Sequence, residues 1–220
     1  MELSTAKGTR DIPPEEAILF QEIQGVLKKN FEIFGFNPLQ TPVLEQFEIL
    51  SSKYTGGAEI LKETFQLQDQ GQRKLGLRYD LTVPFSRFVA MNPQLKMPFK
   101  RYQMGAVFRD GPVASNRLRE FTQCDCDIVG TKNIAADAEC EQLFLQAFAD
   151  LGIDIEVRVN NRKILDGMMD VLKIALEKRG DLILAIDKLD KKSRKEVEEE
   201  IYALGIKREV FAKLFAVLSL

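Results

Sequence analysis

Apolar residues recur at helical intervals in two stretches of the chain. In residues 17–31 they follow a start rich in prolines and acids, Asp11–Glu16, and they stop before Gly35. Prolines and carboxylates in the first turn and a glycine after the last turn are typical of helix ends. We therefore predict a core-facing amphipathic helix here, and a second helix over residues 134–151 that ends at Gly152.

Two further runs, residues 100–109 and 118–128, have the pattern of paired strands. Between them lie Gly111 and Pro112, which are turn residues. We expect an antiparallel hairpin whose loop lies near residues 110–116.

Side chains on the second of these strands separate into two kinds, because successive residues of a strand point to opposite faces. Apart from Glu120, one face collects small or apolar groups suited to packing: Leu118, Thr122, Cys124, Cys126 and Ile128. The other face collects polar, charged and aromatic groups: Arg119, Phe121, Gln123, Asp125 and Asp127. Such a face predicts a site for a charged ligand. Arg109 and Arg117 flank the loop, where two guanidinium forks can grip phosphate oxygens. A solvated hairpin with exposed salt bridges is the alternative for this segment taken alone.

A shorter hairpin is expected from residues 64–68 and 74–78, which flank a turn that contains glycine. It delivers Asp80 and Thr82 to the end of a strand, and a helix is expected to begin directly after them. Asp80 therefore has two interpretations, as the N-cap of that helix or as a residue of a site.

Residues 36–44 contain Pro38 and Pro42, which cannot donate to a sheet ladder. We expect this segment at a sheet edge or an interface. Residues 153–159 alternate isoleucine and valine with other residues, which predicts a half-buried strand. Helices mixed with hairpins in this way are typical of an α+β fold with a largely antiparallel sheet.

After about Asn161 the pattern changes to helical runs without clear strands. We expect helices over residues 165–179, 192–204 and 207–218, separated by Gly180–Asp181 and Gly205.

The charged run at residues 191–200 can be interpreted as a nucleic-acid patch, but its acids balance its bases. A solvated helix face is the favoured interpretation. The change of pattern predicts two domains, residues 1–163 and 164–220.

The composition of the chain limits the kinds of catalysis and of metal site that it can carry. The chain has 220 residues, 45% of them hydrophobic, and a formal net charge of −2. It has no apolar run long enough to cross a membrane and no secretory signal, so we expect a soluble cytoplasmic protein. Histidine is absent, which excludes catalysis by histidine, including Ser-His-Asp triads. The three cysteines are expected to be reduced, and no zinc or other protein-held metal site is predicted.

Four segments carry a resemblance to a known family. Phe108-Arg109-Asp110-Gly111-Pro112, followed by residues 117–128, resembles motif 2 of class II aminoacyl-tRNA synthetases in the form used by histidyl-tRNA synthetases. Lys7-Gly8-Thr9-Arg10-Asp11, Thr41-Pro42-Val43-Leu44-Glu45 at the place of motif 1, and Leu77-Arg78-Tyr79-Asp80-Leu81-Thr82 agree in the same order. Four ordered matches are much harder to obtain by chance than one.

This resemblance implies a reaction and its partners. Histidine would be activated by ATP, with Mg²⁺, to histidyl-adenylate and then transferred to tRNA(His). The region of motif 1 would form a homodimer interface, so a homodimer is implied. Residues 164–220 are similar to the beginning of the helical insertion domain of the family, which contacts the acceptor end of tRNA.

The resemblance also assigns roles position by position. Arg109 would contact the α-phosphate and the amino-acid carboxylate, and Arg117 the terminal phosphates. Phe121 would stack on adenine. Asp80 and Thr82 would bind the α-amino group of the substrate histidine. Gln123 and Asp127 would hold the substrate histidine, and Asp127 would accept a hydrogen bond from its imidazole ring. Arg109 and Gln123 would be the catalytic residues.

Some of the family's pattern has no counterpart here. We find neither motif 3, nor the two histidine-specific segments, nor the anticodon-binding domain. We therefore expect an N-terminal part of the synthetase with little or no aminoacylation by itself, and with an exposed sheet edge. The alternative function is the related regulatory subunit of ATP phosphoribosyltransferase, a non-catalytic protein of histidine biosynthesis.

Overall fold

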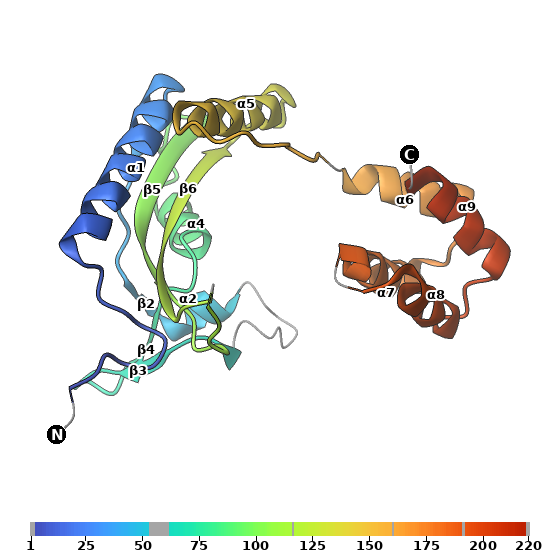
Figure 1. The fold of residues 1–220 in the computed structure, drawn as a ribbon, viewed down its shortest axis with the longest axis horizontal. Coiled ribbons are helices and arrows are strands. Elements are labelled where there is room, and N and C mark those ends of the chain that lie inside the picture. The colour runs from blue at the N-terminus through green and yellow to red at the C-terminus, as the bar shows by residue number, and fades with distance from the viewer. Residues whose placement is uncertain (1–2, 53–61, 116, 160, 191, 219–220) are drawn as a thin grey trace. The chain divides into compact units, whose positions relative to one another are not determined.

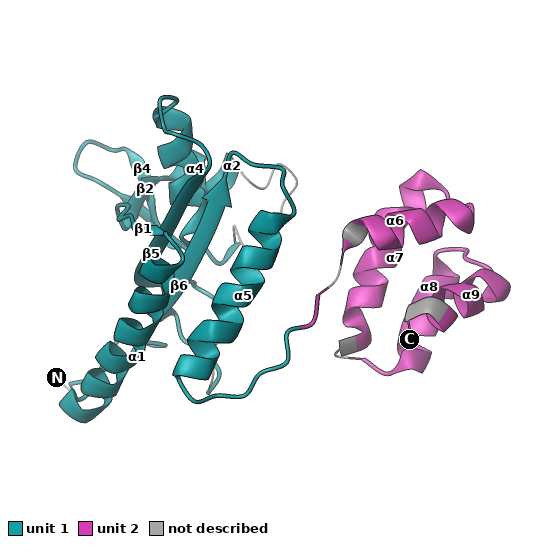
Figure 2. Cartoon of the chain, turned by 90° about the horizontal axis from the view of Figure 1, so that it is seen from above, with its two compact units in different colours: residues 1–157 teal, residues 158–220 magenta. Residues whose placement is uncertain are grey.

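The computed structural model describes residues 3–52, 62–115, 117–159, 161–190 and 192–218. The chain divides into two compact units, residues 1–157 and 158–220 (Figure 2). The first combines strands and helices and the second is helical, so the predicted α+β class is confirmed. The assignment of these units to a catalytic and an insertion domain stays a prediction.

The first unit is built around a long hairpin of β5 (Phe99–Phe108) and β6 (Glu120–Val129). The two strands are antiparallel, and β1 (Asn37–Pro38) pairs in parallel with β5, which gives the order β1-β5-β6. The predicted hairpin is confirmed, with a connection that runs from residue 109 to residue 119. β1 lies at the sheet edge, as its proline predicts.

One face of this sheet packs against α1 (Pro14–Ile33) and α5 (Ala135–Asp150), which lie beside the hairpin in Figure 1. The shared core holds Phe31, Phe36, Tyr102 and Leu143, with Cys126 and Ile128 packed against them. Phe31 and Tyr102 stack with ring centroids 5.1 Å apart. The packing face predicted from alternation on β6 is confirmed for its last two members.

The prediction that α1 faces the core is wrong for its first half. Ile18 and Leu19 are 58% and 56% exposed, and the buried residues of the helix, Asn30 and Phe31, lie near its end. Periodicity locates an apolar stripe on a helix but does not show what covers the stripe.

A second small sheet contains β2 (Leu44–Gln46), β4 (Lys74–Leu77) and β3 (Gln66–Gln68), antiparallel in the order β2-β4-β3. β3 and β4 form the second predicted hairpin. Helix α2 (Phe47–Ser52) adjoins this sheet, and helix α4 (Thr82–Met91) lies against α2, with Arg87 of α4 paired to Glu45 of β2.

The strand predicted at residues 153–159 is not formed. Ile153 and Val159 are 50% and 67% exposed, and no strand of the described residues pairs with the segment. Alternation alone does not make a strand, because the ladder needs a partner to take up its backbone hydrogen bonds.

The second unit consists of α6 (Arg162–Val171), α7 (Leu176–Ile186), the 3₁₀ turn η1 (Asp187–Asp190), α8 (Arg194–Ala203) and α9 (Arg208–Leu218). The last two predicted helices are confirmed. They are separated by Gly205, whose φ of +75° suits glycine.

The single helix predicted over residues 165–179 is wrong. The chain leaves the helix after Val171, passes through Lys173 at φ +55°, and starts α7 at Leu176. Gly180 and Asp181 lie inside α7 instead of separating two helices. The apolar pattern continues across the turn because the two helices bury the same core, so spacing does not show the break.

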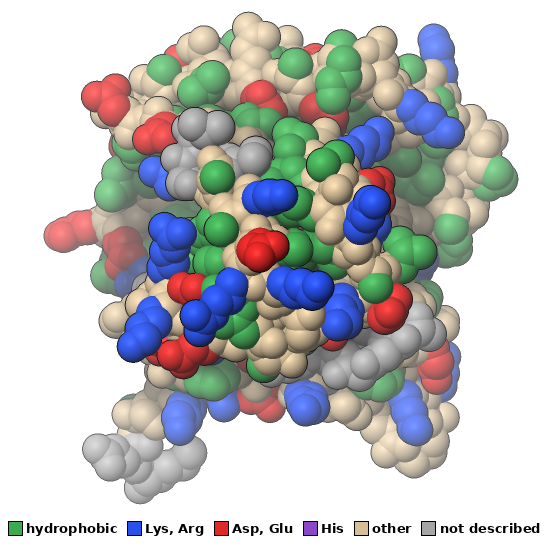
Figure 3. Space-filling model, turned by 90° about the vertical axis from the view of Figure 1, so that its right-hand side faces the viewer, with side chains coloured by type: hydrophobic (Ala, Val, Ile, Leu, Met, Phe, Trp, Pro, Cys, Tyr) green, Lys and Arg blue, Asp and Glu red, His purple; other side chains and the backbone are tan. Residues whose placement is uncertain are grey.

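Charges on the second unit lie at its surface. Glu200 of α8 pairs with Lys188 and Lys192, and Ser193 and Glu196 form a capping box at the start of α8. Basic side chains lie among acidic and hydrophobic ones over the face shown in Figure 3. The ion pairs and the capping box agree with the interpretation of residues 192–200 as a solvated helix face, and Lys191 lies outside the described residues. Within the described residues, no helix is both long and apolar enough to cross a membrane.

Candidate active site

The register of the long hairpin places polar side chains from both strands on one face. Residues directly opposite each other in an antiparallel pair point to the same side of the sheet. The opposing pairs that form this ligand face are Arg101 with Asp127, Gln103 with Asp125, Gly105 with Gln123, and Val107 with Phe121. The face is thus charged at one end and has an aromatic ring at the other.

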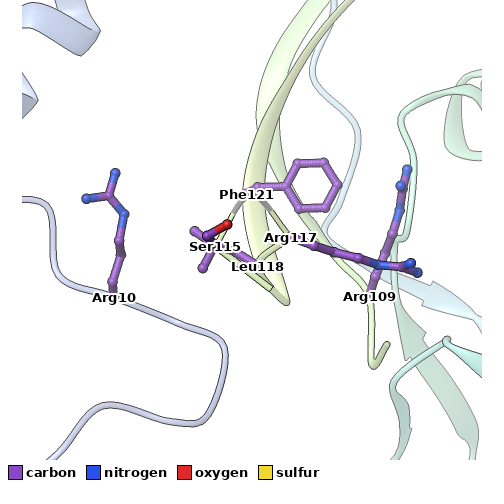
Figure 4. A pocket seen from close by; sticks show the side chains of 6 residues that line it. All are labelled: Arg10, Arg109, Ser115, Arg117, Leu118 and Phe121. Carbon is purple, nitrogen blue, oxygen red and sulfur yellow. The ribbon is translucent and has the colours of Figure 1, made fainter. Parts of the chain in front are cut away.

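A pocket of about 850 Å³ lies at the aromatic end. It is lined by Arg10, Arg109, Ser115, Arg117, Leu118 and Phe121, as Figure 4 shows. The structure therefore brings together the three residues predicted to bind ATP, namely Arg109, Arg117 and Phe121.

The two arginines of the hairpin are held differently. The Arg109 guanidinium lies over the Phe121 ring, with its carbon 5.0 Å from the centroid, and Nε donates to the Tyr79 carbonyl at 3.2 Å. Arg117 is half-exposed, and its Nη2 donates to both carboxylate oxygens of Glu63 at 2.6 and 2.9 Å. An anionic ligand would meet Arg109 in a packed position and would compete with Glu63 for Arg117.

The N-terminal segment rests on the connection of the hairpin. The Arg119 amide donates to the Gly8 carbonyl at 2.7 Å, and Gly8 has φ +83°. A Cβ at Gly8 would lie 2.7 Å from the Cγ of Arg119, so both the conformation and the space require glycine. This contact explains how Arg10, two residues later, comes to line the pocket. Arg10 belongs to one of the matching segments, but sequence reasoning did not select it as a site residue.

The opposite end of the ligand face holds a buried charge. Arg101 has no exposed surface and forms an ion pair with Asp127, whose side chain is 31% exposed. Burial raises the pKa of Asp125, and the nearby positive charge of Arg101 opposes this rise. Sequence reasoning missed Arg101, because the face of β5 on which it lies depends on the register with β6.

Gln123 lies between the two ends. Its Oε1 is buried and has no hydrogen-bond partner among the described residues. A buried amide oxygen without a donor is costly, so this position is suited to a polar ligand.

Asp80 caps the start of α4 and also belongs to the charged cluster. Its Oδ1 accepts from the Val83 amide at 2.9 Å, and it interacts electrostatically with Arg101 and Asp125. The two interpretations of Asp80 are compatible, because a carboxylate has two oxygens. Thr82 is placed apart from the pocket of the hairpin. It lines a different hollow together with Ser86 and Arg87.

Comparison with known proteins identifies the family. The sequence profile described as histidyl-tRNA synthetase matches residues 8–220. The chain belongs to the histidyl-tRNA synthetase family. It is 46% identical over 210 residues to histidine–tRNA ligase 1 of Bacillus cereus, an alignment that covers 96% of this chain and 48% of that protein. The resemblance seen in the four sequence segments is confirmed.

Solved structures agree with this assignment. The crystal structure of histidyl-tRNA synthetase from Nostoc matches with a TM-score of 0.86 at 30% identity, over 98% of this chain and 48% of that one. A structure from Bacillus halodurans titled as an ATP phosphoribosyltransferase regulatory subunit/histidyl-tRNA synthetase matches with a TM-score of 0.81 over 98% of this chain and 55% of that one. Its identity is 24%, so this second likeness shows the fold alone. The chain spans about half the length of the curated relatives it matches.

Proposed function

We propose that this chain supplies the ATP- and histidine-binding hairpin of a histidine–tRNA ligase. In the proposed reaction, the carboxylate of histidine attacks the α-phosphorus of ATP, histidyl-adenylate forms and pyrophosphate leaves. The histidyl group is then transferred to the 3′ end of tRNA(His), and AMP leaves. One observation carries the proposal: Arg109, Arg117 and Phe121 line one pocket, at one end of a strand face whose other end carries Asp127.

At the aromatic end of the ligand face, the proposed catalysis rests on neutralising the phosphate charge and on holding the reacting groups in position. Arg109 contacts the α-phosphate and the carboxylate that attacks it, so it neutralises two anions and holds them in line. Phe121 stacks on adenine. Arg109 lies close to the Phe121 ring, so one ATP molecule could contact Phe121 with its base and Arg109 with its α-phosphate. Arg117 exchanges Glu63 for the terminal phosphates. Both partners are carboxylate or phosphate oxygens, which match the guanidinium fork.

The histidine end would select the amino acid. Asp127 accepts a hydrogen bond from the imidazole ring, and the orphaned oxygen of Gln123 supports a further contact with the substrate. Asp80 and Thr82 bind the α-amino group in this proposal. For Asp80 the carboxylate oxygen that does not cap α4 is the one assigned to the ammonium.

Mg²⁺ is proposed to arrive with ATP. It is usually held by substrate phosphates, one or two carboxylates and water, and it would add positive charge to the leaving pyrophosphate. We propose that Glu63, which pairs with Arg117, would help to hold the ion. The roles of the arginines above do not depend on it.

A homodimer through the motif 1 region is part of the proposal. Val43 and Leu44 are 37% and 51% exposed, and α1 exposes Ile18, Leu19 and Ile23 in the same unit. Exposed large apolar side chains on these two segments support an interaction surface. Residues 164–220 are proposed to contact the acceptor end of tRNA, and the cytoplasm is the proposed compartment.

The alternative, a regulatory subunit of ATP phosphoribosyltransferase, explains the fold equally well. It gives no reason for two arginines and an aromatic ring around one pocket. The pocket therefore favours the ligase.

Histidine-dependent ATP–pyrophosphate exchange by the full-length gene product tests the proposal. We expect exchange with histidine and none without it. Replacing Asp127→Ala should weaken histidine-dependent exchange by about 10- to 150-fold, the worth of a hydrogen bond to a charged group, and leave ATP binding nearly unchanged.

Glu120→Ala is the matched control, because Glu120 is an exposed carboxylate on the other face of the same strand. It should leave both quantities unchanged. Equal losses of exchange and ATP binding in the Asp127 variant would contradict the assigned role, and a regulatory subunit would show no exchange at all.

A further inference from the structure

Arg101 occupies a position on β5 that neither its sequence context nor the proposed reaction explains. The side chain is fully buried and lies opposite Asp127 in the ladder, with which it forms an ion pair. Its guanidinium carbon lies 4.5 Å from the centroid of the Phe85 ring, and Nη2 donates to the Leu81 carbonyl at 3.2 Å. These contacts fix the position of the guanidinium group at the buried, charged end of the ligand face.

Burying the charge of Arg101 costs free energy, so a role in stability alone does not explain it. Desolvation lowers the pKa of Arg101, and the charges of Asp127 and then Asp125 oppose this effect. Nε and Nη1 have no hydrogen-bond partner among the described residues. A buried ion pair is weak evidence for stability, because well-packed apolar residues often replace it without loss.

The partner of Arg101 is the residue to which the proposed function assigns the substrate ring. Asp127 stands between a buried cation and a partly open surface, so one side of its carboxylate is fixed and the other remains accessible. A carboxylate held in this way is oriented before the ligand arrives, which removes the cost of ordering it on binding.

We propose that Arg101 is a positioning residue that aims Asp127 at the imidazole N–H of the substrate. Its positive charge also offsets the repulsion between the neighbouring carboxylates Asp125 and Asp127. Selection of histidine thus depends on a buried residue that does not touch the substrate. The inference rests on the proposed function, since it requires Asp127 to contact the histidine ring.

The test uses the full-length gene product and steady-state ATP–pyrophosphate exchange. Arg101→Met keeps most of the side-chain bulk and removes the charge. We expect the KM for histidine to rise by roughly 10- to 100-fold, as for other residues that orient a binding group, while the KM for ATP stays within about twofold. Discrimination between histidine and 3-(2-thienyl)alanine, which lacks a ring N–H, should fall by a similar factor.

Arg101→Lys keeps the charge but lacks the planar guanidinium fork. This variant replaces Arg101→Met in the test if the methionine variant does not fold. It should give an intermediate rise in the histidine KM. Leu143→Ala is the stability control, because it opens a cavity on the packing face of the same unit. It should lower stability and leave the ratio of the two KM values unchanged.

The double variant Arg101→Met with Asp127→Ala separates positioning from general damage. If Arg101 acts through Asp127, the double variant loses no more discrimination than the Asp127 variant alone. Equal rises of both KM values, or additive losses in the double variant, would overturn the inference. Absence of histidine-dependent exchange in the wild-type protein is a different result, since it would overturn the proposed function itself.

Discussion

The two units differ in what they bury. In the described residues, every buried polar or charged side chain belongs to the first unit: Asn30, Thr41, Glu45, Thr64, Arg78, Arg101 and Gln103. The buried side chains described in the second unit are apolar and form one cluster from Leu165 to Phe215. Ion pairs of the second unit, such as Arg179 with Asp170, involve at least one well-exposed partner.

This difference separates the unit that carries the candidate site from a unit whose described buried side chains form an apolar core. Burying charge is expensive, so a fold keeps it where a ligand or a specific geometry needs it. An apolar core has no buried polar groups that need a partner, so it requires no ligand. The chemistry of the chain is therefore expected on the ligand face of the hairpin, and the helical unit is expected to act through its surface.

The largest effect is expected at Arg109, because this residue belongs to the candidate site of the first unit. Arg109→Lys should lower the rate of adenylate formation by about 10²- to 10³-fold, because a point charge does not replace a fork that binds two anions at once. Single-turnover adenylate formation by the full-length gene product measures it. Arg73→Lys is the control, since the Arg73 side chain is 80% exposed and pairs with Asp69 in a turn. If the Arg109 variant retained adenylate formation, the assignment of the chemistry to the hairpin of the first unit would be contradicted.

A core substitution in the second unit should have a smaller and purely structural effect. Leu214→Ala removes a fully buried side chain and should destabilise the helical unit by about 2–5 kcal/mol. Hydrogen exchange of the whole chain should show lost protection in residues 162–218 and unchanged protection in β5 and β6.

Leu184→Ala is the control for that substitution, because Leu184 is 61% exposed in α7. Its effect should stay within about 0.5 kcal/mol. Equal loss of protection in both units after Leu214→Ala would show that they unfold together, against the division into two independent cores.

The smallest effect concerns the packing face of the hairpin, which should behave like the apolar core of the second unit. Burial raises the pKa of the Cys126 thiol from 9.0 to about 12. The folded protein therefore keeps the proton that the unfolded chain loses, so this contribution to stability is complete below pH 9.0 and is lost as the pH rises towards about 12.

Urea unfolding as a function of pH measures this contribution. In Cys126→Ala the fall in stability over that range should be shallower than in the wild-type protein. Rapid alkylation of folded Cys126 at pH 8 would mean that the packing face is open to solvent, which contradicts its place in the core.

Local patterns predicted much of the first unit. Alternation on β6 separated Cys126 and Ile128 from Gln123 and Asp127 before any partner strand was known, because the pleat fixes which side chains share a face. Helix signals located α1 and α5 to within a few residues. The pocket residues Arg109, Arg117 and Phe121 were selected by family resemblance, and the fold then placed them together.

Predictions failed where an element depends on a distant partner. The alternating residues 153–159 lack a strand beside them, and half of the apolar stripe on α1 is uncovered. The turn between α6 and α7 interrupts a continuous apolar pattern, because both helices face one core. Each of these outcomes is decided by contacts between residues far apart in the chain.

Residue chemistry and spacing were sufficient to predict the two hairpins, the family and a site for a charged ligand, because these depend on neighbours along one strand or helix. The ion pair between Arg101 and Asp127 could not be predicted in this way. Arg101 and Asp127 are separated by the whole connection of the hairpin, and only the register of β5 against β6 brings them opposite each other. Burial then turns an ordinary basic residue of a strand into the partner of the carboxylate assigned to the substrate, because a cation removed from water needs an anion beside it.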